Sequence, residues 1–210
     1  MNQLKVKVCG MRDPENIRTI GGLLPDYMGF IFYKDSPRYV GESFSIPNDL
    51  PSTVKRVGVF VNEFTNVILE TTSRFKLQAV QLHGQEKADQ CRELKDNGLT
   101  VIKAFSLHDG FDFENVRTYY SAVDYLLFDT KGKYFGGNGV PFNWSILERY
   151  DQCIPFILSG GLSNRNLDEI MELSTMNLHA LDVNSGVEMS PGQKDVQLTR
   201  QFISKARSFV

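Results

Sequence analysis

Hydrophobic residues in this chain gather in eight short runs that recur along its whole length. The runs are rich in β-branched and aromatic residues and are nearly continuous rather than alternating, which is typical of parallel strands buried on both faces. They cover residues 4–8, 27–32, 56–61, 79–82, 100–105, 125–128, 155–158 and 179–183. The pattern therefore predicts eight strands of a parallel sheet.

Segments with helical periodicity separate most of these strands. Asp13 followed by Pro14 is a good N-cap and first helical residue. The other amphipathic segments are 86–97, 164–173 and 194–209. Residues 43–54 contain two prolines, so we expect only a short or irregular helix there.

Eight strands that alternate with helices form either a closed barrel or an open doubly wound sheet. An open sheet of this size would normally carry a dinucleotide or P-loop fingerprint after its first strand, and neither motif occurs. No linker or low-complexity tract divides the chain. We therefore expect a single (β/α)8 TIM barrel domain over residues 1–210, near the short end of the size range for this fold.

Composition narrows the functional classes. The 210 residues are 41% hydrophobic and 23% charged with a net charge of −2, which is ordinary for a globular protein and disfavours nucleic acid as a partner. The three cysteines are widely spaced and the three histidines do not fall at metal-ligand spacing, so neither a disulfide framework nor a metal site is expected. Without a signal-type or membrane-spanning apolar run, we expect a cytoplasmic protein that does not associate with membranes.

Two glycine-containing turns follow the last two predicted strands. The first is Ser159, Gly160 and Gly161, and the second is Asn184, Ser185 and Gly186. Glycine lets backbone N–H groups approach an anion closely, and in (β/α)8 barrels the loops after strands 7 and 8 often bind phosphate. We therefore expect these turns to bind the phosphate group of a substrate.

The other strand ends carry one side chain of each of four chemical kinds. They are the thiol of Cys9, the guanidinium of Arg38, the imidazole of His83 and the carboxylate of Asp129. In a parallel barrel these ends meet at one mouth. This set suits proton transfer on a phosphorylated small molecule better than redox chemistry.

Several other polar residues have a structural interpretation. We expect Cys91 and Cys153 to fill the core. Lys7 and Lys103 either point into the barrel and pair with Asp182 or face outward.

Ordered motifs along the chain resemble the phosphoribosylanthranilate isomerase family of tryptophan biosynthesis. The matching segments are 7–11, 29–39, 57–62, 80–84, 127–130, 136–144, 158–162, 182–188 and 191–195. They cover the chain from end to end in the order of the family, which makes the set far more specific than any one segment.

The resemblance implies an Amadori rearrangement of N-(5-phosphoribosyl)anthranilate to 1-(2-carboxyphenylamino)-1-deoxyribulose 5-phosphate, without a cofactor. It implies that Asp129 is the general acid and Cys9 the general base. Arg38 is expected to bind the anthranilate carboxylate, because a planar guanidinium can meet a carboxylate with two hydrogen bonds. His83 lies in the same layer, and we include it among the candidate substrate-binding residues.

The sequence departs from the family pattern at a few positions. Arg12 stands where threonine is usual, and Asn184 replaces a serine or threonine. A hydroxyl contact from position 184 to phosphate is therefore not expected, although the amide of asparagine can donate instead.

Two alternative functions stay open at this point. Another phosphate-binding barrel enzyme, such as indole-glycerol-phosphate synthase or a sugar-phosphate epimerase, would be expected to show catalytic Lys and Glu residues or metal-binding His and Asp clusters at its strand ends. A non-catalytic phosphosugar-binding barrel should have lost the acid or the base, whereas Cys9 and Asp129 are both present.

Overall fold

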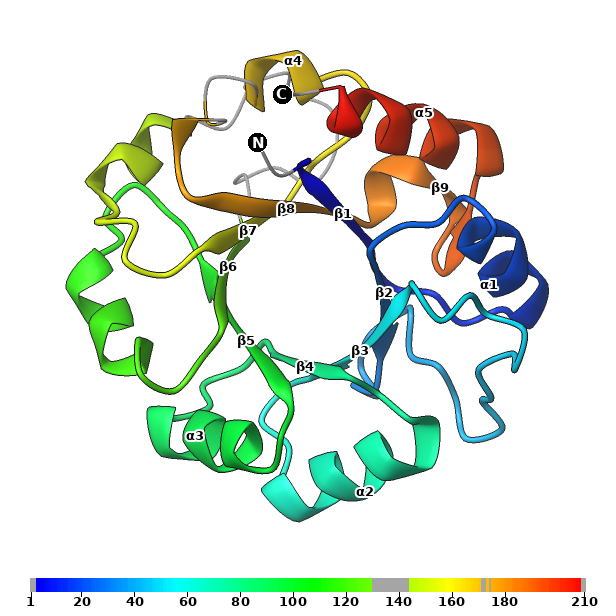
Figure 1. Ribbon diagram of the computed structural model, residues 1–210, viewed down its shortest axis with the longest axis horizontal. Helices are drawn as coiled ribbons and strands as arrows, with labels where there is room; N and C mark the ends of the chain where they lie inside the picture. The colour runs from blue at the N-terminus through cyan, green and yellow to red at the C-terminus, as the bar shows by residue number, and fades with distance from the viewer. Residues whose placement is uncertain (1–2, 130–143, 171–172, 174, 209–210) are drawn as a thin grey trace.

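Eight parallel strands close into a barrel in the computed structural model, which describes residues 3–129, 144–170, 173 and 175–208. Each strand pairs with the next along the chain, and β1 pairs with β8 to close the ring (Figure 1). The strands are β1 (Lys5–Val8), β2 (Tyr27–Ile31), β3 (Lys55–Phe60), β4 (Ala79–Leu82), β5 (Thr100–Ser106), β6 (Tyr125–Asp129), β7 (Phe156–Ser159) and β8 (Leu178–Val183). The predicted barrel is confirmed.

Helices surround the barrel on its outer side (Figure 1). The α-helices are α1 (Pro14–Gly21), α2 (Thr65–Phe75), α3 (Ala88–Asp96), α4 (Leu167–Ile170) and α5 (Val196–Arg207). The 3₁₀ helices are Phe113–Tyr119, Trp144–Arg149 and Ser185–Val187. A short antiparallel pair, β9 (Glu188–Ser190) and β10 (Gln193–Lys194), lies between β8 and α5. Residues 43–54 contain turns and no helix, so the short or irregular helix expected there does not form.

Local sequence explains where two of the helices begin. The Asp13 carboxylate accepts a hydrogen bond from the Asn16 amide at 2.8 Å, and Pro14 occupies the first helical position of α1. Asp195 caps α5 in the same way, accepting from the Leu198 amide at 2.8 Å. Because β10 ends directly before this cap, the start of α5 fixes the position of the β9–β10 hairpin.

The strands bury side chains on two faces. One cluster fills the barrel interior and consists of Tyr27, Val57, Ala79, Ile102, Ala104, Leu127, Ile157 and Ala180. A larger cluster packs between the outer face of the strands and the surrounding helices. Since successive side chains of a strand point to opposite faces, Lys7 and Asp182 share the interior face, whereas Lys103 lies between two interior residues and points outward.

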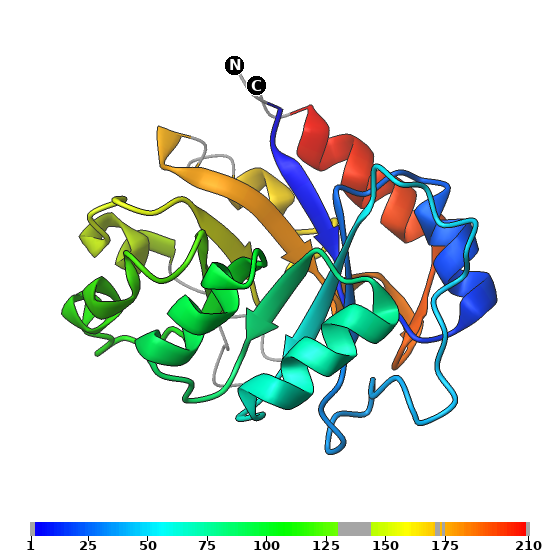
Figure 2. The same ribbon diagram turned by 60° about the horizontal axis from the view of Figure 1, so that its bottom comes forward.

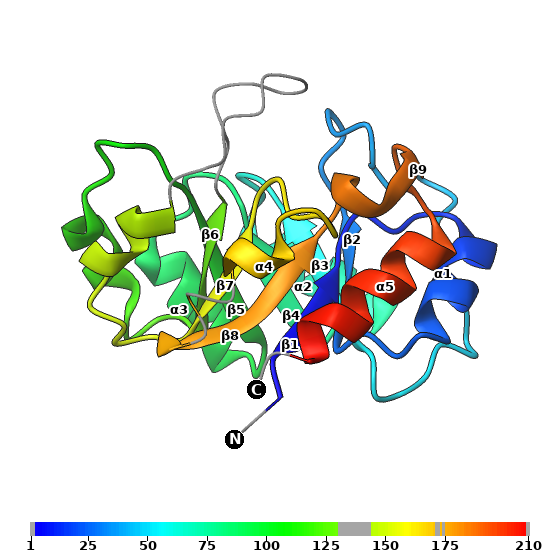
Figure 3. The same ribbon diagram turned by 90° about the horizontal axis from the view of Figure 1, so that it is seen from above.

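All eight strands run in one direction, so their carboxyl ends meet at the same end of the barrel (Figure 2). Seen from above, β9 lies at that end, beside the light-blue segment that follows β2 (Figure 3). We call this end the mouth. No helix among the described residues has the length and apolar character needed to cross a membrane.

Candidate active site

Cys9 lies at the mouth because it continues the β1 ladder by one residue. Its amide donates to the Val183 carbonyl at 2.9 Å, and its side chain is buried. The sulfur occupies space that a side chain at position 29 would need, since a Cβ on Gly29 would lie 2.7 Å from it. Lys7, two residues earlier on the same face, donates to Asp182 Oδ2 at 2.9 Å and interacts electrostatically with the Cys9 thiol.

Charges around Cys9 act in opposite directions on its ionisation. Burial raises the pKa of the Cys9 thiol, and Lys7 opposes this rise only in part. Burial also opposes ionisation of Lys7, but Asp182 and Cys9 leave the pKa of its ammonium raised. The thiol is therefore the resting form of Cys9. A buried ammonium beside it stabilises the thiolate once that forms.

Asp129 is the last residue of β6 and faces His83. The imidazole Nε2 of His83 lies 3.3 Å from Asp129 Oδ2, and its Nδ1 lies 3.1 Å from the amide nitrogen of the buried Gln81. These contacts place the His83 imidazole between Gln81 and the Asp129 carboxylate.

Asp182 connects the two halves of this arrangement. It interacts electrostatically with Cys9 and Lys7 on one side and with Asp129 and His83 on the other. Its Oδ1 is buried and has no hydrogen-bond partner among the described residues. The structure therefore brings the predicted base and the predicted acid around one buried carboxylate.

Arg38 follows β2 and is held by a residue that the sequence does not single out. Its Nε lies 2.9 and 3.1 Å from the two carboxylate oxygens of Glu188, and its Nη2 lies 2.6 Å from Oε2. The aliphatic part of Arg38 lies against Gly10, directly after Cys9. Arg38 is thus placed at the mouth, with one edge of its guanidinium already occupied.

Lys194 of β10 contacts the Arg38–Glu188 pair through the Glu188 carboxylate. Its fully buried ammonium donates to Glu188 Oε1 at 2.7 Å and to Asn184 Oδ1 and O at 2.7 and 3.2 Å. Burial outweighs the attraction of Glu188 and lowers the pKa of Lys194. Burial acts against ionisation of Glu188 too, but Arg38 and Lys194 leave the pKa of its carboxyl lowered. The sequence does not reveal this ion cluster, because Arg38 lies 150 positions from Glu188 along the chain.

The two glycine-containing turns lie against each other. Gly160 and Gly161 adopt φ values of 95° and 67°, which the turn after β7 requires. A Cβ on Gly186 would lie 1.9 Å from the Leu162 carbonyl oxygen, so the second turn packs directly on the first. Among the described residues, the Gly161 amide N–H has no acceptor. Two glycine turns in contact are where the sequence predicts a phosphate site.

Other sequence-based expectations have mixed outcomes. Cys91 is buried on α3 as predicted, but the prediction for Cys153 is wrong, because this thiol is exposed in the turn before β7. Lys103 does not pair with Asp182. Its ammonium bonds to Glu86 Oε2 at 3.1 Å on the outer face of β5. The family-like segment 136–143 and Thr130 lie outside the described residues.

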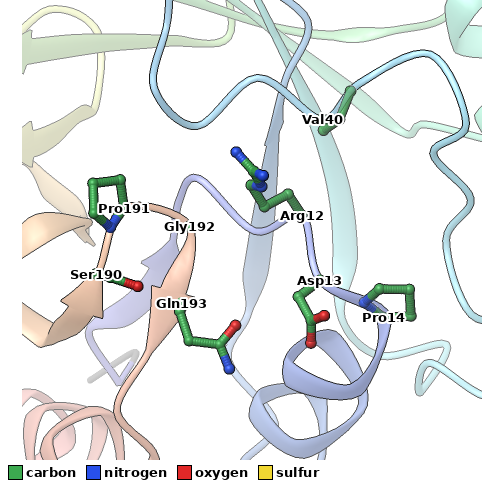
Figure 4. Close-up of a pocket in the computed structure, with 8 residues that line it drawn as sticks. All are labelled: Arg12, Asp13, Pro14, Val40, Ser190, Pro191, Gly192 and Gln193. Carbon is green, nitrogen blue, oxygen red and sulfur yellow. The ribbon is translucent and has the colours of Figure 1, made fainter.

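A hollow of about 410 Å³ lies beside the mouth, between the start of α1 and the β9–β10 hairpin. It is lined by Arg12, Asp13, Pro14, Val40, Ser190, Pro191, Gly192 and Gln193, none of them a predicted site residue. Arg12 lies between Gly192 and Val40 (Figure 4) and donates to the Pro37 carbonyl at 3.1 Å. Arg12, one of the residues that depart from the family pattern, therefore bridges the hairpin and the segment that carries Arg38.

The described residues contain no group of three or more His, Cys, Asp or Glu side chains placed to hold a metal ion. Barrel, buried thiol, carboxylate–imidazole pair and paired glycine turns together define a barrel of the phosphosugar-isomerase type. Residues 6–205 match the family model for N-(5'-phosphoribosyl)anthranilate (PRA) isomerase. The chain belongs to this family.

Individual relatives agree with the family model. The chain is 44% identical over 202 residues to N-(5'-phosphoribosyl)anthranilate isomerase of Phocaeicola vulgatus, covering 96% of this chain and 97% of that protein. The phosphoribosyl anthranilate isomerase structure from Thermotoga maritima superimposes with a TM-score of 0.84 at 36% identity, covering 98% and 99% of the two chains.

One solved relative is a complex with a small molecule. That phosphoribosyl anthranilate isomerase holds reduced 1-(o-carboxyphenylamino)-1-deoxyribulose 5-phosphate, and it matches this chain with a TM-score of 0.82 at 34% identity over 98% and 99% of the two chains. The family match favours this isomerase over the synthase and epimerase alternatives that the sequence left open.

Proposed function

We propose that the protein converts N-(5-phosphoribosyl)anthranilate to 1-(2-carboxyphenylamino)-1-deoxyribulose 5-phosphate, a step of L-tryptophan biosynthesis that takes place in the cytoplasm. The observation that carries this proposal is the arrangement of Cys9 and Asp129 around Asp182 at the mouth of a barrel from this family. The ligand in the solved relative is a reduced form of the proposed product.

The reaction begins with proton transfer to the furanose ring oxygen. Asp129 supplies the proton, the C1–O bond breaks, and the nitrogen lone pair forms an iminium at C1. The His83 imidazole, whose Nε2 lies 3.3 Å from Asp129 Oδ2, positions the acid. The resulting iminium makes the C2 proton acidic.

The Cys9 thiol first loses its proton to solvent, and the thiolate then removes the C2 proton. The C2–H electrons form a C1–C2 double bond and neutralise the iminium, which gives an enolamine that tautomerises to the ketone. C1 is reduced and C2 is oxidised within one molecule, so the electrons balance without an external partner. Lys7 stabilises the thiolate, and its pairing with Asp182 keeps this ammonium beside the sulfur.

The two ends of the substrate are bound by different groups. The turns 159–161 and 184–186 hold the phosphate through backbone N–H groups, including that of Gly161. Arg38 binds the anthranilate carboxylate with the donors that Glu188 leaves available.

A fluorescence assay tests this function directly. The anthranilate conjugate is generated in solution, purified protein is added, and loss of its fluorescence is followed while the product is identified by mass and reduction with borohydride. We expect rapid, protein-dependent decay to a single aminoketose. Absence of decay with folded protein would instead favour a phosphosugar-binding barrel without activity.

A further inference from the structure

Glu188 has more charged partners than any other carboxylate described at the mouth. It receives two donors from Arg38, one from the ammonium of Lys194 and one from the Gly192 amide at 2.9 Å. Its side chain is 5% exposed and that of Lys194 is fully buried. A carboxylate with this many short, buried, charge-assisted bonds is fixed in position.

The bonds to Glu188 restrict how Arg38 can meet a ligand. Glu188 occupies Nε and one hydrogen of Nη2, which together form one edge of the guanidinium. Within the described part of the chain, Nη1 makes no hydrogen bond. Only the other edge, formed by Nη1 and the second hydrogen of Nη2, can therefore donate to both oxygens of a carboxylate.

Lys194 links this arrangement to the other end of the mouth. The same ammonium that bonds to Glu188 also bonds to the side chain and the carbonyl of Asn184, the first residue of the second glycine turn. The carboxylate-binding arginine and one phosphate-binding turn are therefore positioned from one buried ammonium. The ion cluster of Arg38, Glu188 and Lys194 also keeps a net positive charge, which favours an anionic ligand.

We propose that Glu188 and Lys194 are positioning residues that determine specificity for a substrate with an aromatic carboxylate, by holding Arg38 in a fixed orientation at a fixed distance from the turn 184–186. This inference rests on the proposed function, because it assigns the carboxylate of that substrate to Arg38. Neither residue exchanges a proton with the substrate.

A second role for Lys194 is distinguishable from this one. Its ammonium also interacts electrostatically with the Cys9 thiol. If that interaction were its main contribution, loss of Lys194 would lower kcat and shift the pH profile of kcat equally for every substrate. A positioning role instead weakens binding, and only for ligands with the carboxylate.

The experiment measures Kd by calorimetry for two non-reacting ligands. The first is reduced 1-(o-carboxyphenylamino)-1-deoxyribulose 5-phosphate, and the second is the same compound made from aniline, which lacks the carboxylate. The wild type should bind the first ligand at least about 10-fold more tightly, as expected for a charge-assisted pair. We call the Kd for the aniline ligand divided by the Kd for the carboxylate ligand the Kd ratio. Glu188→Gln, which keeps the size of the side chain, should bring this ratio close to one and leave Kd for the aniline ligand within about twofold of the wild-type value.

Two further variants sharpen the test. Lys194→Met should reduce the Kd ratio as Glu188→Gln does. In an Arg38→Ala background Glu188→Gln should add nothing, since residues that act through one group are not additive. The matched control is Glu86→Gln, which removes the charge of the other buried glutamate paired with a buried lysine. This control should leave the Kd ratio unchanged.

Three results would overturn the inference. They are a wild type that does not distinguish the two ligands, a Glu188→Gln variant that weakens both equally, and a Lys194→Met variant whose only defect is a lower kcat with a shifted pH profile. Far-UV circular dichroism and thermal melting show whether each variant is folded, and Glu188→Gln remains decisive if Lys194→Met does not fold. Failure of the proposed function would appear separately, as a wild type without turnover.

Discussion

The two ends of the barrel differ in the partners of their titratable side chains. At the mouth, polar groups are arranged in pairs that each contain one proposed catalytic residue, as with Cys9 beside Lys7 and Asp129 beside His83. At the opposite end, Tyr27 and Tyr125 enclose His179, which stacks on Tyr125 at 4.0 Å between ring centroids and bonds to the Tyr27 hydroxyl at 2.8 Å.

This difference shows how burial serves opposite purposes within one barrel. Burial lowers the pKa of His179 to about 4, so the imidazole is a neutral packing group over the physiological range. Burial raises the pKa of Cys9, but an ammonium lies close enough to stabilise its charged form. Lys5 and Lys55 disfavour the charged form of His179, whereas Lys7 favours that of Cys9, so a buried titratable residue becomes chemically useful here where a neighbouring charge stabilises its ionised form. Variants at the mouth should therefore change rates, and variants at the other end should change stability.

The largest effect is expected from removing the acid or the base. Asp129→Asn and Cys9→Ala should each lower kcat by roughly 10²–10⁴-fold, the usual contribution of general acid–base catalysis. Their thermal midpoints should stay close to that of the wild type, measured by circular dichroism. Near-wild-type turnover in either variant would remove that residue from its proposed role and weaken the contrast between the two ends.

The next effect concerns binding at the mouth. Arg38→Ala should raise KM by about 10- to 100-fold with a smaller change in kcat, because a charge-assisted contact to the carboxylate is lost. Steady-state kinetics measure both constants. An unchanged KM would contradict the assignment of Arg38 to the substrate. Arg18→Ala is a suitable control, because Arg18 forms exposed ion pairs on α1.

A variant at the opposite end should show the reverse pattern. His179→Ala removes a ring that stacks on Tyr125 and leaves the Tyr27 hydroxyl without its partner, which should destabilise the fold by about 2–3 kcal/mol. Urea denaturation measures this loss, and kcat/KM below the transition should stay within about twofold. A large fall in kcat/KM without loss of stability would show that the two ends are not functionally separate.

The smallest effect is a dependence of stability on pH that comes from the same histidine. In the folded protein the pKa of His179 is about 4, below its ordinary value of 6.5, so the unfolded chain takes up a proton first as the pH falls. The contribution of His179 is therefore complete above about pH 6.5 and is lost between pH 6.5 and 4.

Because the ring is partly exposed, we expect this loss to be about 1–2 kcal/mol. Urea denaturation at several pH values measures it. The wild type should lose more stability across this window than His179→Gln. A matched His108→Gln variant, at an exposed position, should behave as the wild type does. Parallel pH profiles for wild type and His179→Gln would refute the assignment.

The strands and the mouth could be predicted from sequence because their signals are local. Each strand is a continuous apolar run, and a residue at its carboxyl end reaches the mouth by topology alone, which located Cys9, Asp129 and His83. The start of α1 could be predicted equally well, because Asp13 and Pro14 stabilise the helical turn that directly follows them.

Contacts between distant segments could not be predicted in this way. Glu188 and Arg38 are 150 positions apart, and only the closure of the barrel brings β9 beside the segment after β2. Lys103 was ambiguous because its partner depends on which face of β5 points inward. Cys153 was misassigned for a related reason: it precedes an apolar strand, but the turn that holds it lies on the surface.

The absence of a side chain at Gly29 has a consequence for redesign of the site. The Cys9 sulfur fills the space that a Cβ there would take, and the same Cβ would lie 3.2 Å from the Lys7 ammonium. The size of the proposed base, its distance from the Lys7 ammonium and the identity of residue 29 therefore cannot be changed independently. A library that diversifies position 9 alone will return mainly residues no larger than cysteine, whereas any residue 29 larger than glycine will require a smaller group at position 9.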